Sequence, residues 1–124
     1  MAFFEGDRVR EIFLGDTADA TQNSLINAKG AEADQKIADW LYITANRYGK
    51  LLALPAVDVA SGQLGGAAAP QHIKDAASNL AAALCFYKID NKNMGDKYYE
   101  LARSTVEGYI IRLESESEIY SANV

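Results

Sequence analysis

Apolar residues recur at helical spacing in four stretches of the chain, and each stretch predicts an amphipathic helix. The first covers about residues 7–14, where Val9, Ile12 and Phe13 share one face and Gly15 is suited to end the helix. The second covers about residues 20–48. Its apolar stripe consists of Leu25, Ile26, Ala33, Ile37, Leu41, Ala45 and Tyr48. Gly30 lies inside this stripe, which indicates either a break or a close helix contact, since glycine costs about 1 kcal/mol relative to alanine in a helix.

Two further helices are expected in the second half of the chain. One opens at Pro70, a favoured first-turn residue, and ends before the turn-forming segment 89–93. Its stripe is Ile73, Ala77, Leu80, Leu84 and Tyr87. The other covers about residues 95–113, with Asp96 as its expected cap. We expect one side of it to carry Tyr98, Leu101, Ala102, Thr105, Tyr109 and Leu113, with Ile110 adjacent.

The remaining segments lack helical spacing. Residues 50–69 are apolar but rich in glycine and alanine, and they predict a long loop with short extended pieces near residues 56–60. Residues 114–124 are acidic and then mildly apolar, which indicates a tail that a partner orders. The pattern therefore predicts an all-α fold, with one four-helix bundle over residues 1–113 followed by an acidic tail.

Composition and charge restrict the partners and the compartment. A formal net charge of −5 argues against broad phosphate neutralisation, although an acidic wall can let DNA slide past without sticking. No apolar run is long enough to span a bilayer, and the first residues do not follow a signal-peptide pattern. Cys85 is the only cysteine, so no intramolecular disulfide can form. We expect a protein used in the cytoplasm, or one packed into a particle assembled there, with no membrane partner.

The residues that could carry chemistry are isolated from one another in the sequence. His72 has no companion ligands, and we expect Cys85 to be a small core residue. The glycine-rich residues 62–66 lack the Lys-Ser or Lys-Thr that follows a phosphate-binding loop. Acidic residues are expected to lie on solvated helix faces: Glu32, Asp34, Asp39, Glu100 and Glu107. The sequence therefore predicts no catalytic residue, no metal site and no cofactor.

The aromatic residues exceed what one stripe per helix can hide. Neighbours such as Phe86 and Tyr87, or Tyr98 and Tyr99, cannot both face one core. One reading is that a member of each pair lies on the surface with its polar end in water. The other is an intersubunit contact, for which Trp40, Phe86 and Tyr99 are the candidates.

The order of these parts resembles the head–tail connector (adaptor) proteins of tailed phages and related viruses. The resemblance covers about residues 7–87 and is carried by residues 37–39 (Ile-Ala-Asp), 47–48 (Arg-Tyr), 54–55 (Leu-Pro) and 70–87, which open with Pro-x-x-Ile-Lys. The chain departs from the family in its glycine- and alanine-rich insert, residues 56–69, and in its extended last helix with an acidic tail.

The resemblance implies a virion protein that forms a homo-oligomeric ring, usually a dodecamer, beneath the portal. Such a ring joins the filled head to the tail or to a stopper protein, and DNA passes through its lumen. Combined with the aromatic residues above, it gives these candidates for subunit contacts: Trp40, Leu54, Pro55, Val57, Leu64, Phe86 and Tyr99. It gives these candidates for portal docking: Tyr109, Ile110, Leu113, Ile119 and Tyr120. The alternative is a small cytosolic helical module that binds one protein partner without catalysis.

Overall fold

Four helices and three very short strands make up the part of the chain that the structure describes. The computed structural model describes residues 3–48 and 57–122, with the side chains of 44–48 and 114–122 outside that description. The helices are α1 (Gly6–Leu14), α2 (Asn23–Tyr48), α3 (Gln71–Lys88) and α4 (Lys92–Ala122), and the strands are β1 (Val57–Asp58), β2 (Gln63–Leu64) and β3 (Ala67–Ala68). The all-α bundle is confirmed. Gly15 ends α1 in the left-handed conformation, as expected.

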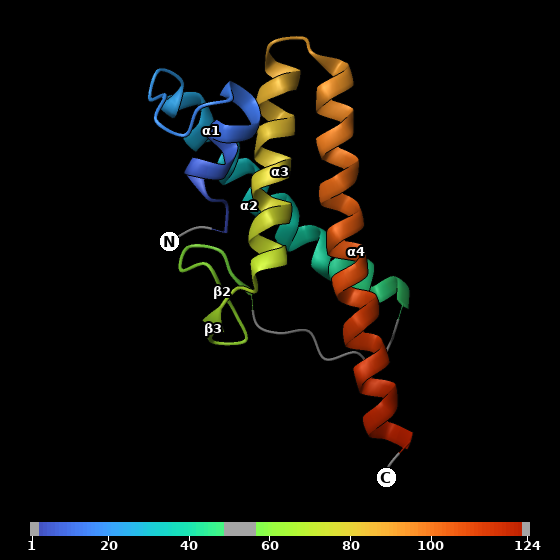
Figure 1. Cartoon of the computed structure of the whole chain (residues 1–124). Coiled ribbons are helices and arrows are strands. Elements are labelled where there is room, and N and C mark those ends of the chain that lie inside the picture. Colours follow the sequence, from blue (N-terminus) through green and yellow to red (C-terminus); the bar gives the residue numbers. More distant parts are fainter. Residues whose placement is uncertain (1–2, 49–56, 123–124) are drawn as a thin grey trace.

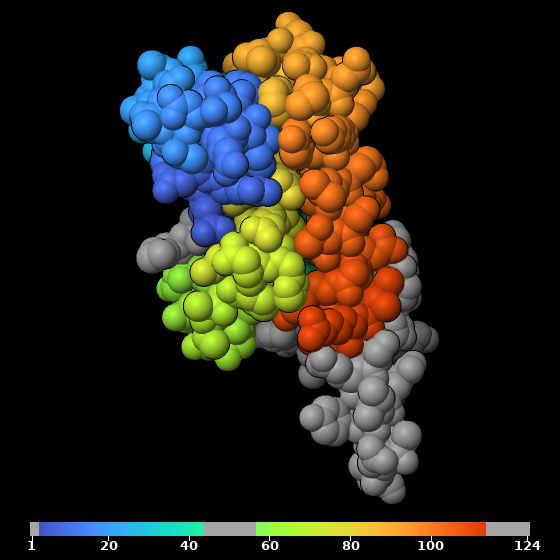
Figure 2. Space-filling view, viewed as in Figure 1, coloured from blue at the N-terminus to red at the C-terminus, as the bar shows by residue number. Residues whose placement is uncertain are grey.

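The helix α3 forms the centre of the bundle. Figure 1 shows it between α1 and α4, with α2 crossing behind, and Figure 2 shows α1 and α4 packed against its two sides. Because it is covered on several sides, nearly every residue from Ala76 to Phe86 is buried. Five of these residues are alanines, and such small side chains let the neighbouring helices approach closely. The larger core side chains include Ile73 and Leu80, each worth about 1.5–3 kcal/mol when fully buried.

A tight turn joins α3 to α4 and sets them antiparallel. Asn91 caps α4, because its side-chain oxygen accepts the amide N–H of Met94 at 3.3 Å. The expected cap, Asp96, instead lies inside the helix and accepts hydrogen bonds from Tyr87 at 2.5 Å and Lys92 at 2.6 Å. Gly95 is needed here, because a Cβ at that position would stand 2.5 Å from the Tyr87 ring.

The glycine-rich segment is more regular than its sequence suggested. Residues 57–68 form two consecutive hairpins in the order β1-β2-β3, all antiparallel. Gly65 and Gly66 make the second turn, and both have positive φ (63° and 80°), which a two-residue hairpin of this hand requires. The strand β1 lies within the extended piece expected near residues 56–60, whereas β2 and β3 were not expected. Residues 49–56 lie outside the described part.

The segment of residues 3–5 is held against the bundle by its backbone. The amides of Phe3 and Phe4 donate to the two carboxylate oxygens of Asp34 at 3.1 and 3.0 Å, and the amide of Glu5 donates to Ser78 at 2.9 Å. Phe3 is fully buried. The Phe4 ring fills the space over Gly30, where a Cβ would stand 2.4 Å from it. The close contact expected at Gly30 is therefore with this segment and not with a helix.

The burial of Asp34 corrects the expectation that its carboxylate is solvated. Only 1% of the residue is exposed. Burial raises its pKa from the ordinary 3.8 to about 6, although the two amide donors, Phe4 and then Phe3, act in the opposite direction. Asp34 is therefore a structural group that holds Phe3 and Phe4 against α2.

The last helix extends beyond its expected limits at both ends. It begins at Lys92 and continues to Ala122, whereas the sequence predicted residues 95–113. The buried positions on its inner side are Ala102, Val106 and Ile110, while Leu101, expected on that side, is exposed. The backbone of residues 114–122 is helical and continuous with the bundle helix, so these residues are not an irregular tail.

Candidate protein-binding surface

The helix α4 continues well past the helix on which it packs. His72 lies in the first turn of α3, and its ring centroid is 5.3 Å from that of Tyr109 on α4. The N-terminal end of α3 is therefore level with Tyr109. Residues 110–122 of α4 lie beyond it, which corresponds to about 20 Å of helix at 1.5 Å per residue. Figure 1 shows this C-terminal part projecting away from the other helices. We call residues 110–122 the overhang.

Only the first residues of the overhang are held by the bundle. Ile110 is fully buried and belongs to the core, and Leu113 is half-buried against it. Ile111 is 42% exposed and points away from that contact. The remaining large apolar side chains that are exposed among the described residues are Tyr42, Ile43, Ile89 and Leu101. None of these five exposed residues was a predicted contact residue.

The aromatic candidates for subunit contacts pack largely within the chain itself. Phe86 is only 6% exposed, with its ring edge-on to Phe13 at 5.2 Å and stacked on Tyr98 at 5.9 Å. It therefore belongs to the core, and its placement among the surface contact residues is corrected. Trp40 and Tyr99 are half-buried and contact each other edge-to-face at 5.4 Å. One side of this pair stays partly exposed, and a neighbouring subunit could contact the pair there.

The loop candidates have mixed positions. Leu64 is buried on β2 and Val57 is half-buried on β1, so both contribute to the packing of the hairpins on the bundle. Leu54 and Pro55 lie outside the described residues. The two described residues, Leu64 and Val57, therefore form no exposed apolar patch, and the roles of Leu54 and Pro55 stay predictions.

The docking candidates follow the axis of α4. Ile110 is buried and is corrected as an exposed docking residue, while Tyr109 and Leu113 are half-buried. Ile119 and Tyr120 lie on the helical backbone of the overhang, and their side chains lie outside the described part. Their docking role stays a prediction.

The groups that could react have structural surroundings. Cys85 is fully buried as expected, and burial raises its pKa to about 11, with Lys29 acting in the opposite direction. His72 is half-buried against Tyr109. Within the described residues, no three histidine, cysteine or acidic side chains come together as metal ligands, and no helix is long and apolar enough to cross a membrane.

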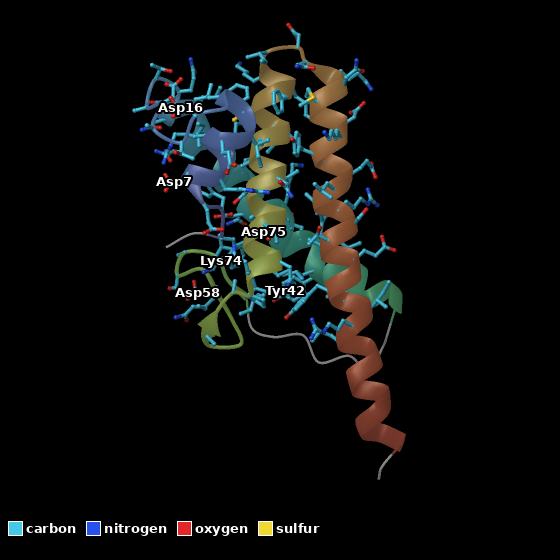
Figure 3. The ribbon with its side chains drawn as sticks, in the orientation of Figure 1. Asp7, Asp16, Tyr42, Asp58, Lys74 and Asp75 are labelled. Carbon is cyan, nitrogen blue, oxygen red and sulfur yellow. The ribbon has the colours of Figure 1, made fainter. Side chains whose placement is uncertain are left out.

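Acidic side chains gather on the side of the molecule opposite α4. Figure 3 shows Asp7, Asp16, Asp58 and Asp75 around α1, the hairpins and the start of α3. Residues 5–19 alone hold five acidic and two basic side chains, a net −3 of the chain's −5. Both basic residues form ion pairs, Arg10 with Asp7 and Arg8 with Glu11, and the net −3 is the charge that is left with both arginines counted. The α1 side therefore carries a negative field.

The comparisons with known proteins leave the surface to be interpreted from its own geometry. No protein-family model, curated protein or solved structure matches this chain.

Proposed function

We propose that this chain is a structural virion protein, a head–tail connector that forms a ring beneath the portal and joins the DNA-filled head to the tail or stopper. The observation that carries the proposal is the overhang, residues 110–122 of α4, which extends about 20 Å beyond α3. The order of elements that resembles the connector family gives the proposal its specific partner. No catalytic or cofactor-dependent step is part of it.

The outer part of the overhang, residues 114–122, suits a docking role because no other described helix runs alongside it in Figure 1. Isolated helices of this length are marginal in water, so a projecting helix is stabilised when a partner covers it. A partner surface that exists only on the assembled portal would then fix the overhang at the right stage. Docking through a helix that its partner stabilises would make attachment wait until the portal is assembled.

The acidic α1 side suits the wall of a DNA channel. A ring of these subunits with that side facing inward would present Asp7 and Asp16 to the passing duplex. Like charges repel, so the DNA would pass without adhering. A ring also needs two different patches on each subunit that fit each other, because its interfaces are heterologous.

The test is binding to the portal ring encoded together with this chain, measured by co-sedimentation. A variant that ends after Leu113 removes the outer overhang and none of the described core residues, so it should fold but fail to co-sediment. At single-residue level, Ile119→Asp should weaken binding, while Ser121→Asp adds the same charge nearby as the control. Full binding by the truncated chain would refute docking through the overhang. Absence of portal binding by the intact chain would favour the one-partner cytosolic module.

A further inference from the structure

The helix α4 has a second apolar face, turned away from α3. Its inner side is fully used by the core, at Ala102, Val106 and Ile110. The opposite side carries four exposed residues, which we call the outer seam: Leu101, Ser104, Gly108 and Ile111. Leu101 and Ile111 are 46% and 42% exposed. The spacing of three, four and three residues is that of the contact positions of a helix pair.

The side chains of the outer seam are arranged by size in a way that fits their own reversed copy. Two large residues, Leu101 and Ile111, flank two small ones, Ser104 and Gly108. A Cβ built at Gly108 meets nothing within 4 Å, so the middle of the seam is open to a close approach. When a second α4 runs antiparallel, Leu101 faces Ile111 of the second copy, and Ser104 faces its Gly108. A single register therefore places a large residue opposite a large one, and a small residue opposite a small one, at all four positions of the seam.

Charge selects the antiparallel direction over the parallel one. In the antiparallel register, the exposed Glu100 of each copy aligns with the exposed Arg112 of the other, which pairs opposite charges. In a parallel pair, Glu100 and Arg112 would each align with the same residue of the second copy. Opposed helix dipoles also favour the antiparallel arrangement. Figure 1 shows α4 at the edge of the molecule, with α3 on one side of it.

We infer that two copies of this chain form an antiparallel, two-fold dimer through the outer seams of their α4 helices. The contact uses the same patch on both copies, so it closes after two subunits. A cyclic ring of more than two subunits cannot use such a contact between neighbours. The dimer is therefore a separate state of the free protein, and this inference goes beyond the proposed function and does not depend on it.

The first experiment is sedimentation equilibrium of the intact chain and two leucine variants. Gly108→Leu adds apolar surface and raises helix propensity, but it fills the space that close approach needs, so dimerisation should weaken about tenfold or more. Arg103→Leu adds a leucine at an exposed position off the seam and should leave the dimer constant unchanged. A monomeric intact chain at every concentration tested, or stronger association of Gly108→Leu, would overturn the inference.

The second experiment tests the direction of pairing with introduced cysteines. The native Cys85 is buried and does not interfere. A mixture of Leu101→Cys and Ile111→Cys chains should form a mixed disulfide under mild oxidation, while each variant alone should not. Disulfides within either variant alone would indicate parallel pairing and overturn the antiparallel dimer. The outcome says nothing about portal binding, so the two proposals can fail separately.

Discussion

The buried carboxylate of Asp34 makes stability depend on pH in an unusual direction. In the folded chain its pKa is about 6, against an ordinary value of 3.8 in the unfolded chain. Between these values the folded state binds more protons than the unfolded state, so the free energy of unfolding falls as the pH rises. Each pKa unit corresponds to about 1.4 kcal/mol, so the full change is about 3 kcal/mol, complete above pH 6.

The perturbation that isolates this effect is Asp34→Asn. Asparagine keeps the shape and one acceptor oxygen for the backbone amides of Phe3 and Phe4, but it cannot titrate. Urea unfolding of both proteins should be followed from about pH 3.5 to 7.5, and the difference between them taken at each pH. This difference cancels the opposite contribution of carboxylates such as Asp96, whose pKa is lowered by its bonds to Lys92 and Tyr87. Intact chain minus variant should fall by about 3 kcal/mol with rising pH. A flat or rising difference would refute the raised pKa of the buried Asp34 carboxyl group.

Three further predictions concern local packing. Gly95→Ala should destabilise the fold by about 1–3 kcal/mol, because the new methyl group meets the Tyr87 ring, and the loss should vanish in a Tyr87→Ala background; a stabilised single variant would contradict this. Cys85 should react with iodoacetamide at pH 8 only after denaturation, since burial raises its pKa, and labelling of the native chain at a free-thiol rate would show that it is accessible. Ser78→Ala should cost about 1 kcal/mol in urea unfolding by removing the acceptor of the Glu5 amide, whereas an unchanged midpoint would mean that water replaces it.

The helices were predictable because their core faces repeat every three or four residues. The spacing of Ile37 and Leu41 or of Ile73 and Leu80 reflects the same packing that buries them in the structure. The error at α4 has a physical cause as well. Leu101 is more apolar than its neighbour Ala102, yet alanine is the residue that fits the close α3–α4 contact. Because the prediction favoured the more hydrophobic residue, it placed the inner face of α4 too far toward Leu101.

Long-range contacts were the part that the sequence did not reveal. Asp34 was assigned to solvent by its charge, although its spacing from Gly30, Ile37 and Leu41 places it on the apolar face of α2. Its partners, the amides of residues 3 and 4, are about thirty residues away. Phe86 was placed on the surface for a similar reason, since it is enclosed by side chains from two other helices. Such pairings depend on how the helices cross, which periodicity does not encode.

The central claim is that this chain assembles on a portal vertex, and electron microscopy of the protein mixed with its portal ring tests it most directly. The account predicts added density in the form of a second ring, coaxial with the portal and in contact with it at the α4 end of each subunit. Portal particles that look the same with and without an excess of the folded chain would contradict it.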